Sequence, residues 1–424
     1  MKTIIRGGRI LDPANEIDTI ADLIIQDGKI VASNANNSDG NVKIIDAKGC
    51  FVMPGLIDMH VHLRDPGLTY KEDIESGAKA AAKGGFTTIV AMPNTKPVID
   101  NAAGIEYVAN QAKDKAIINV LQVGAITKGQ AGDELADIEE MVGAGSPAIS
   151  EDGKSVMNAR LYREAMKIAA KCDIPVLAHC EDINMALDGC VNDDAIATKQ
   201  GLKGISNAVE DTIVARDIIL AKETGVHLHL CHCSTKDSVA MIDEAKKAGV
   251  RLSAEVCPHH FTLTTEDMVA NDTNYKMNPP LRTSTDVEAL KRGLAEDIIE
   301  VISTDHAPHS VKEKNTSMEL APFGIVGLET CVALTISELV RPEIITPMQM
   351  ARKCSYNPAK VLKIDRGTLG VGAVADVVII DPEEEYVIAA KDFVSKGRNM
   401  PFEGRKVYGK VMYTICDGNI VYEG

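Results

Sequence analysis

The sequence contains no tryptophan, and aromatic residues make up only 4% of its 424 residues. It therefore lacks the aromatic platforms on which proteins stack nucleic-acid bases. It also has no basic excess, because its formal net charge is −16, and this argues against binding to a phosphate backbone. The two deficits argue against a nucleic-acid partner.

Long apolar runs are missing as well. No stretch approaches the roughly 18 apolar residues that a membrane-spanning helix requires, and the N-terminus lacks a signal-peptide pattern. The ten cysteines lie between Cys50 and Cys416 without paired spacing, which indicates reduced thiols rather than a disulfide framework. We therefore expect a cytoplasmic protein that has no contact with a membrane.

Both ends of the chain have a β-rich pattern. Asp27-Gly28 near the start and Asp417-Gly418 near the end each separate two short apolar segments, and both dipeptides favour a hairpin turn. Neither end can build a core alone, so we expect residues 1–54 and 363–424 to pack together as one small β-sandwich domain.

Glycine and proline residues predict where two of these terminal strands are interrupted. Near the start, separate strands are expected at 3–5 and 9–11, on either side of Gly7-Gly8. Near the end, a Val/Ile strand over 376–381 is expected to stop before Pro382, because proline offers no N–H to a β-ladder.

Between the ends, strand patterns alternate with helical patterns. Helices are expected at 71–83, 158–172, 207–224 and 236–248, most of them closed by glycine. Eight strands alternating with helices predict a (β/α)8 TIM-like barrel over residues 55–362. An open, doubly wound sheet is the competing fold, but no Gly-x-Gly-x-x-Gly follows the first strand. The strands are expected at 56–62, 88–92, 118–123, 147–150, 175–178, 227–231, 251–256 and 301–304.

The first of these strands carries a His-x-His pair. Alternate residues of a strand share a face, so Asp58, His60 and His62 are expected to point the same way. Two imidazoles held on one face suit a divalent metal, although a hydrogen-bonded pair of core histidines would give the same pattern.

Other predicted strands also end in metal-binding residue types. In a barrel these strand ends meet on one face, so imidazoles and carboxylates from distant segments converge there. Six ligands exceed the four of a tetrahedral zinc, so two metal ions bridged by a carboxylate and a hydroxide are the simplest solution. His60, His62 and Asp305 would hold one ion and His179 and His232 the other, with Asp152 between them.

Cysteine ligands are less favourable than this set. Cys231 and Cys233 flank His232, but adjacent strand residues face opposite ways, so the three are not expected to bind one ion.

Several polar residues near the predicted metals could act on a substrate. Asp305 could carry a proton from water to a leaving nitrogen, or serve only as a ligand. Arg64 could bind a carboxylate bidentately, or form a salt bridge with Asp65 or Glu72. Further candidates are Asn94 and Asn278, as well as a polar lid over 310–322 with Gly324 behind it, whose backbone N–H could approach the ligand.

These motifs resemble the amidohydrolase superfamily and, more narrowly, the bacterial class I dihydroorotases. The resemblance covers essentially the whole chain. It is carried by Asp-Met-His-Val-His-Leu-Arg-Asp-Pro-Gly (58–67), Ala-Met-Pro-Asn-Thr (91–95), Glu-Asp-Gly (151–153), Ala-His-Cys-Glu (178–181), Ser-Thr-Asp-His-Ala-Pro-His (303–309) and Phe-Gly-Ile-Val-Gly-Leu-Glu-Thr (323–330).

The resemblance implies a zinc-dependent cyclic amide hydrolase that interconverts N-carbamoyl-L-aspartate and (S)-dihydroorotate in pyrimidine biosynthesis. Many members of the superfamily bridge their metals with a carboxylated lysine, whereas Asp152 holds that position here. Lys154, two residues further on, is the alternative bridge that the resemblance implies. By similarity Asp305 is the catalytic acid and base. The substrate residues would be His62, Arg64, Asn94, Asn278, His309, Phe323 and Gly324.

Other functions compete with this interpretation. Within enzymes, the alternative is a hydantoinase or an allantoinase. Arg64 distinguishes a dihydroorotase from both, because dihydroorotate carries a ring carboxylate that simple hydantoins and allantoin lack. From another class, the chain could be a non-catalytic barrel that supports an aspartate carbamoyltransferase, but such a homologue would be expected to have lost metal ligands. The acidic surface is also compatible with a homodimer.

Overall fold

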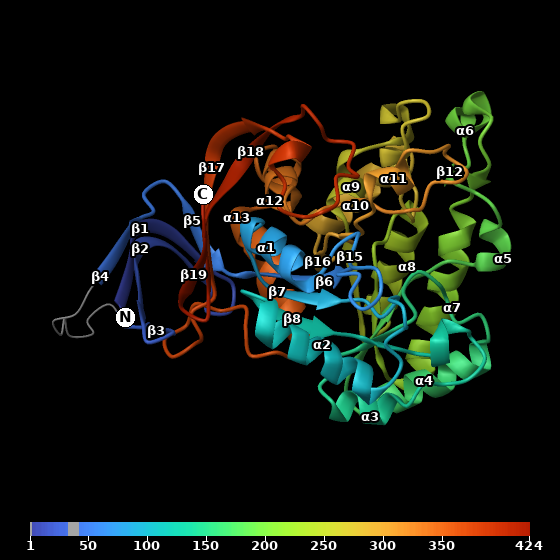
Figure 1. The fold of residues 1–424 in the computed structure, drawn as a ribbon, viewed down its shortest axis with the longest axis horizontal. Helices are drawn as coiled ribbons and strands as arrows, with labels where there is room; N and C mark the ends of the chain where they lie inside the picture. Colours follow the sequence, from blue (N-terminus) through green and yellow to red (C-terminus); the bar gives the residue numbers. More distant parts are fainter. Residues whose placement is uncertain (1, 33–41) are drawn as a thin grey trace.

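The computed structural model describes residues 2–32 and 42–424. Within these residues, strands from both ends of the chain join in one eight-stranded sheet, next to which lies a barrel (Figure 1). The order along the sheet is β19-β18-β17-β5-β1-β2-β3, and β4 pairs with β1. The bounds are β1 (Lys2–Asp12), β2 (Ile17–Gln26), β3 (Lys29–Val31), β4 (Val42–Asp46), β5 (Phe51–Pro54), β17 (Val377–Val387), β18 (Lys406–Cys416) and β19 (Asn419–Glu423).

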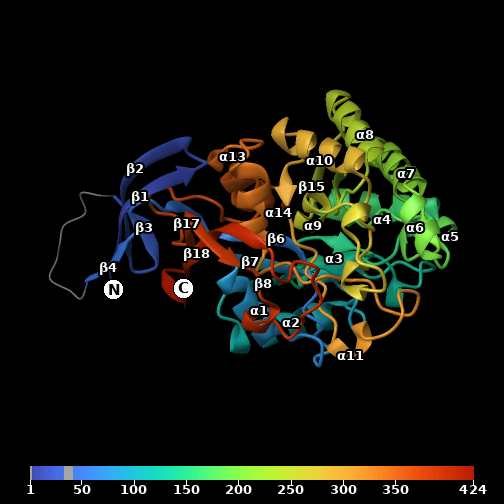
Figure 2. The same cartoon turned by 90° about the horizontal axis from the view of Figure 1, so that it is seen from above.

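The terminal sheet folds back on itself around an aliphatic core. Both predicted hairpin turns are present, with positive φ at Asp27 and Gly28 and again at Asp417 and Gly418. The two turns touch, because a Cβ built on Gly418 would lie only 2.5 Å from the Cα of Gly28. The expected sandwich is therefore one continuous sheet whose two ends meet (Figure 2).

Two strand predictions in this sheet were wrong. The segments expected at 3–5 and 9–11 belong to the single strand β1, which absorbs the intervening glycines in an irregularity between Ile5 and Gly8. β17 also continues beyond Pro382, because its pairing with β18 skips from Asp381 to Glu385 and then resumes. A bulge thus removes the need for a proline N–H in the ladder.

The eight predicted barrel strands are all present as parallel neighbours. The third is broken in two, so that β8 pairs with β7 and β9 pairs with β10. The barrel closes where the His62 N–H donates to the His306 carbonyl at 2.8 Å. The bounds are β6 (Leu56–Val61), β7 (Phe86–Ala91), β8 (Asn119–Gln122), β9 (Gly124–Ala125), β10 (Ile149–Ser150), β11 (Pro175–Ala178), β14 (His227–Leu230), β15 (Leu252–Val256) and β16 (Val301–Ile302).

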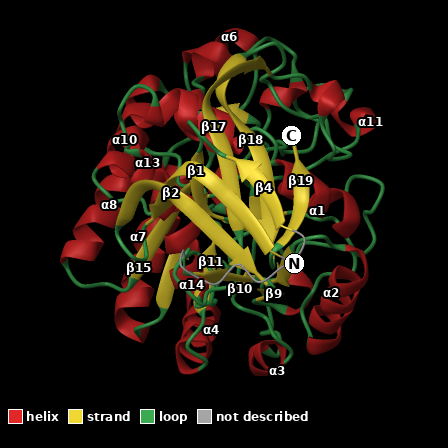
Figure 3. Cartoon of the chain, turned by 90° about the vertical axis from the view of Figure 1, so that its left-hand side faces the viewer, coloured by secondary structure: helices red, strands yellow, loops and turns green. Residues whose placement is uncertain are grey.

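Helices surround the barrel strands (Figure 3). The first begins later than predicted, because Asp73 and Ser76 form a capping box that starts the helix at Ile74 and leaves Lys71 on the preceding loop. The helices that follow the strands are α1 (Ile74–Lys83), α2 (Ala102–Lys115), α3 (Ile138–Gly143), α4 (Ala159–Lys171), α7 (Ala208–Thr224), α8 (Lys236–Lys247), α10 (Ser284–Ala295), α12 (Cys331–Thr335), α13 (Pro347–Ala351) and α14 (Asn357–Leu362).

Short elements near the barrel mouth were not predicted. The segment expected as an irregular lid begins with a helical turn, and its buried Lys314 donates to the carbonyls of Thr273, Lys276 and Pro322. None of the described helices is long and apolar enough to cross a bilayer. The additional elements are α5 (Ile183–Ala186), β12 (Val191–Asn192), α6 (Ala195–Gln200), β13 (Gly204–Ile205), α9 (Pro258–Thr262) and α11 (Val311–Lys314).

Candidate metal centre and active site

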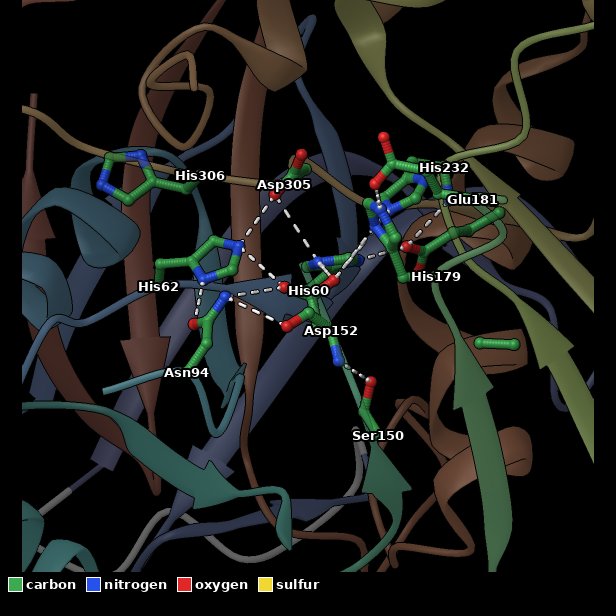
Figure 4. A network of polar contacts seen from close by, with 12 residues as sticks. His60, His62, Asn94, Ser150, Asp152, His179, Glu181, His232, Asp305 and His306 are labelled. Carbon is green, nitrogen blue, oxygen red and sulfur yellow. Dashed lines mark hydrogen bonds and ion pairs between the residues drawn. The ribbon is translucent and has the colours of Figure 1, made fainter. Parts of the chain in front are cut away.

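The ends of five barrel strands bring six predicted ligands together (Figure 4). His60 lies on β6, and the other five lie within three residues of the ends of β6, β10, β11, β14 and β16. All six are buried, and none is more than 6% exposed. They are His60, His62, Asp152, His179, His232 and Asp305.

One half of the cluster is formed by the His-x-His pair and the two carboxylates. His62 Nε2 lies 3.0 Å from Asp305 Oδ1, and His60 Nε2 lies 3.5 Å from the same oxygen. Asp152 approaches from the other side, with Oδ1 3.0 Å from His60 Nε2 and Oδ2 3.5 Å from His62 Nε2. His60, His62 and Asp305 thus present three ligand atoms within 4.8 Å of one another.

The other half is formed by His179 and His232. Their facing nitrogens, His179 Nδ1 and His232 Nε2, lie 2.9 Å apart. Asp152 Oδ1 lies 3.7 Å from the first and 3.9 Å from the second. Asp152 therefore lies between the two halves.

Outer hydrogen bonds fix the protonation of three of these imidazoles. His60 donates through Nδ1 to Glu255 Oε1 at 2.8 Å, and His179 donates through Nε2 to Glu181 Oε2 at 3.1 Å. His62 donates through Nδ1 to Asn94 Oδ1 at 2.9 Å. In each ring the other nitrogen faces the cluster, where either a proton or a metal ion can bind it, as in histidine ligands of metals.

An unpartnered atom gives a further test of whether these residues fit a metal. His60 Nε2 is buried and has no hydrogen-bond partner among the described residues, although carboxylate oxygens surround it. A buried polar atom without a partner is costly, and a cation between the nitrogens and the carboxylates removes that cost. The donor set of imidazole nitrogens and carboxylate oxygens therefore fits a divalent metal.

Electrostatics favour a cation at the same place. Burial opposes protonation of His60, but the carboxylates of Asp152 and Asp305 outweigh it and raise the pKa of His60 well above its usual value. Burial likewise opposes ionisation of Asp152, yet the surrounding histidines hold its pKa well below the usual range. Burial and the neighbouring His179 and His60 lower the pKa of His232 to about 3. The cluster thus combines ionised carboxylates with a neutral imidazole, which is the form that binds metal.

A cavity of about 200 Å³ opens above the cluster. This volume suits a small molecule and not a polymer. Its wall contains five of the six predicted ligands, while His60 lies underneath. All the residues predicted to bind substrate line it: His62, Arg64, Asn94, Asn278, His309, Phe323 and Gly324.

Arg64 does not form the salt bridge that was its alternative role. Asp65 accepts from the Tyr107 hydroxyl, and Glu72 pairs with His306. Within the described part of the chain, the only hydrogen bond of the Arg64 side chain runs from Nε to the Pro308 carbonyl at 3.3 Å. Arg64 is only 8% exposed and lines the cavity, so it is a buried cation that has no anionic partner among the described residues.

Two other substrate candidates have partners of their own in this structure. The Asn94 amide accepts from His62 and donates to Asp152 Oδ2 at 3.1 Å, so it orients two of the clustered side chains. The Gly324 N–H donates to the Lys276 carbonyl at 3.0 Å, contrary to the expectation that it would approach a ligand. A glycine is required here, because a Cβ would lie 2.6 Å from the Ala307 carbonyl.

Three acidic or basic residues near the motifs lie outside the cavity. Asp58 accepts from the backbone N–H groups of Thr304 and His60 and does not line the cavity; the pairing of β6 with β7 is irregular between Asp58 and Val61, which interrupts the predicted alternation. Glu151 accepts from the backbone N–H groups of residues 126 and 127. Lys154 donates to the Gln130 carbonyl at 2.9 Å and does not line the cavity.

Two carboxylates that orient the clustered histidines were not predicted: Glu181 holds His179, and Glu255 holds His60. Glu181 lies two residues after its histidine, a spacing that could have indicated a contact. Glu255 is on β15, 195 residues from His60, and also accepts from His229 Nε2 at 3.1 Å. No local pattern in the sequence indicates such a pairing.

Solved structures define the class to which this fold and site belong. The L-hydantoinase (dihydropyrimidinase) of Arthrobacter aurescens superimposes with a TM-score of 0.88 at 27% identity, covering 99% of this chain and 96% of that one. A D-hydantoinase gives a TM-score of 0.86 at 27% identity, covering 100% and 95%. The class is the amidohydrolase superfamily of metal-dependent barrels.

Sequence relatives narrow the class to one family. A family profile described as "Dihydro-orotase-like" matches residues 49–238. A dihydroorotase of Pelotomaculum thermopropionicum is 48% identical over 100% of this chain and 99% of its own length. A dihydroorotase of Clostridioides difficile is 49% identical over 99% of both. The chain belongs to the dihydroorotase family, whose members are cyclic amide hydrolases.

Proposed function

We propose that this chain catalyses the reversible cyclisation of N-carbamoyl-L-aspartate to (S)-dihydroorotate with loss of water, in the de novo synthesis of UMP. Similarity to dihydroorotases along the whole chain supports the reaction. The observation that carries it is the buried Arg64, which lines the cavity beside the clustered histidines and has no anionic partner in the part of the chain that the structure describes. Both proposed reactants carry a carboxylate that such a cation binds, whereas hydantoin and allantoin do not.

The proposal includes two zinc ions. His60, His62 and Asp305 would hold one and His179 and His232 the other, with Asp152 between them, and the distances among their ligand atoms support this division. When bound, zinc supplies positive charge that polarises a carbonyl and makes water acidic near neutral pH. Lys154 is excluded from this assignment, because its ammonium group is bonded to the Gln130 carbonyl away from the cavity.

Asp305 is assigned the role of acid and base. Burial opposes ionisation of Asp305, but His60 and His62 outweigh it and hold its pKa below the usual value, so the carboxylate is ready to accept a proton. Its Oδ1 faces the histidines, and no described residue forms a hydrogen bond with Oδ2. In ring opening, Oδ2 takes the proton of the attacking water and returns it to the ring nitrogen as the C–N bond breaks.

The remaining cavity residues would hold the substrate. Arg64 and His309 lie close together on the wall and suit the ring carboxylate, because both can present N–H donors there. Asn94 and Asn278 provide amide groups for the ring, while Phe323 and Gly324 complete the wall around it. Since His62 also borders the cavity, it would contact both metal and substrate.

An assay of substrate preference tests the proposal. The purified protein, loaded with zinc, is given dihydroorotate and carbamoyl aspartate in parallel with hydantoin and allantoin. We expect turnover of the first pair in both directions and little of the second pair. Faster turnover of hydantoin than of dihydroorotate would replace the proposed reaction with a hydantoinase activity.

The proposal also includes a cytoplasmic location and association with an aspartate carbamoyltransferase. All ten cysteines are free thiols, and nine of them are buried, which supports a reducing compartment such as the cytoplasm. Because an aspartate carbamoyltransferase produces carbamoyl aspartate, it is the enzyme with which association would shorten the path of the substrate. Sedimentation of the chain, alone and mixed with that transferase, tests the complex and also a homodimer.

A further inference from the structure

Lys71 is a buried cation that the proposed reaction does not use. It lies on the loop between β6 and α1, and only 9% of it is exposed. Its Nζ atom lies 3.2 Å from His309 Nδ1 and 2.8 Å from Glu313 Oε1. The ammonium group thus connects His309 in the cavity wall with Glu313 in the short helix α11.

The two partners of His309 determine where its proton lies. An ammonium group can only donate, so His309 Nδ1 must accept from Lys71. A carbonyl can only accept, so His309 Nε2 must donate to Phe323 O, at 2.8 Å. His309 is therefore neutral, with its proton on Nε2. Burial and the positive charges of Arg64 and Lys71 agree, since they lower the pKa of His309 to about 2.

Glu313 holds Lys71 in place. Its carboxylate accepts from Lys71, from the Tyr70 hydroxyl at 3.0 Å and from the Ser310 hydroxyl at 2.8 Å. Burial opposes its ionisation, but Lys71 and Ser310 outweigh this and lower the pKa of Glu313 to about 2. The Lys71 ammonium is thus fixed by an ionised partner and is not free to rotate away from His309.

We propose that Lys71 is a positioning residue that keeps the His309 proton on Nε2, where it donates to the carboxylate of the substrate next to Arg64. This inference rests on the proposed function, because the group that accepts from His309 Nε2 is the carboxylate of the proposed substrate. Phe323 O holds this N–H in the ligand-free protein, and a carboxylate oxygen of the substrate replaces it. Lys71 contacts no substrate atom and acts through His309.

The tautomer of His309 depends on which of its two ring nitrogens has a hydrogen-bond donor as its partner. Without Lys71, His309 Nδ1 would be a buried acceptor with no donor, which favours moving the proton from Nε2 to Nδ1. Nε2 would then present a lone pair to the Phe323 carbonyl and to an incoming carboxylate, and both contacts become repulsive. Substrate binding weakens, while the metal ligands and Asp305 are unaffected.

Nitrogen NMR of the ligand-free protein reads the tautomer directly. In protein with 15N-labelled histidine, the His309 signals are assigned by their loss in a His309→Gln variant. We expect the Nε2–H pattern in the unaltered protein and in Lys71→Arg, which still donates, and a shift towards Nδ1–H in Lys71→Met. An unchanged tautomer in a folded Lys71→Met protein would overturn the proposal.

Kinetics test the consequence for the substrate. We expect Lys71→Met to raise KM for dihydroorotate about tenfold and to change kcat less than about threefold, and Lys71→Arg to restore most of the affinity. Zinc content should be unchanged. Lys79→Met, on the exposed face of α1, is the control for removal of a lysine and should match the unaltered enzyme. A fall in kcat at unchanged KM, or equal losses in Lys71→Arg and Lys71→Met, would contradict a role through His309.

The two proposals fail in different ways. If the unaltered enzyme does not turn over dihydroorotate but its His309 tautomer depends on Lys71, the proposed function is wrong and the role of Lys71 in placing the proton remains. If dihydroorotate is turned over and neither the tautomer nor KM responds to Lys71→Met, only the role of Lys71 is wrong.

Discussion

The core of the terminal sheet and the mouth of the barrel are both buried, but they bury opposite kinds of side chain. The core of the sheet consists of aliphatic side chains such as Ile5, Ile25 and Ile379, each at most 1% exposed. The barrel mouth buries imidazoles, carboxylates and the Arg64 guanidinium to a similar degree. Burial of apolar groups stabilises the fold, whereas burial of charge costs free energy unless each group finds a partner. The buried charged and polar groups therefore mark the functional site of the protein.

The terminal sheet and the barrel mouth also differ in where non-glycine residues adopt a positive φ. In the sheet, non-glycine residues with positive φ include Asp27 and Asp417, which occupy hairpin turns that tolerate it. At the barrel mouth, Arg64, His232 and Asp305 have φ of 59°, 33° and 48°, and all three line the cavity. Such conformations persist where the surrounding structure fixes them, and they cluster at functional sites.

The largest expected effect is at Asp305. Replacing Asp305 with Asn keeps the size of the side chain but removes the carboxylate that carries the proton, so we expect kcat to fall by about 10³-fold. Steady-state assays with dihydroorotate measure the loss. The exposed Asp114→Asn on α2 serves as control and should retain full activity. A loss below tenfold would assign the proton transfer to another group.

Arg64→Ala should have the next largest effect. We expect kcat/KM for dihydroorotate to fall by about 10²-fold or more, because a charge-assisted bidentate contact is lost, while zinc content stays the same. Kinetics and metal analysis of the same preparation check both parts, with the exposed Arg160→Ala on α4 as control. Unchanged activity would refute the role of Arg64 in carboxylate binding.

Glu255→Gln addresses the orientation of His60. The carboxylate that accepts from His60 Nδ1 would become a weaker amide acceptor, and we expect zinc affinity to fall by about 10- to 100-fold. Competition with a zinc chelator measures the affinity, and the exposed Glu139→Gln on α3 is the comparison. Equal affinities in the two variants would show that Glu255 does not support the metal.

The smallest effect on activity is expected in the terminal sheet. Ile25→Ala removes a side chain that is 1% exposed and should lower the free energy of unfolding by about 2–4 kcal/mol, with kcat within about twofold of normal. Ile20→Ala, on the same strand but 76% exposed, should change stability by less than about 0.5 kcal/mol. Denaturant unfolding and kinetics at 25 °C measure both. A parallel loss of kcat in Ile25→Ala would mean that the sheet and the barrel mouth are coupled.

Local patterns in the sequence are enough to predict the eight barrel strands, the two terminal hairpins and the convergence of the histidines and aspartates. Each of these depends on neighbours along the chain: the periodicity of side chains, a turn dipeptide, or a residue at the end of a strand. The barrel then brings the strand ends together by its own closure, as at His62 and His306.

Contacts between residues that lie far apart in the chain could not be predicted and are set by the folded barrel. Glu255 accepts from His60, Pro382 is bypassed by a bulge in β17, and Lys71 fixes the proton of His309. These contacts join residues that no local pattern relates. Hydrogen bonding between buried groups depends on a fraction of an ångström and on which partner remains free, and both are set only when the whole barrel has formed.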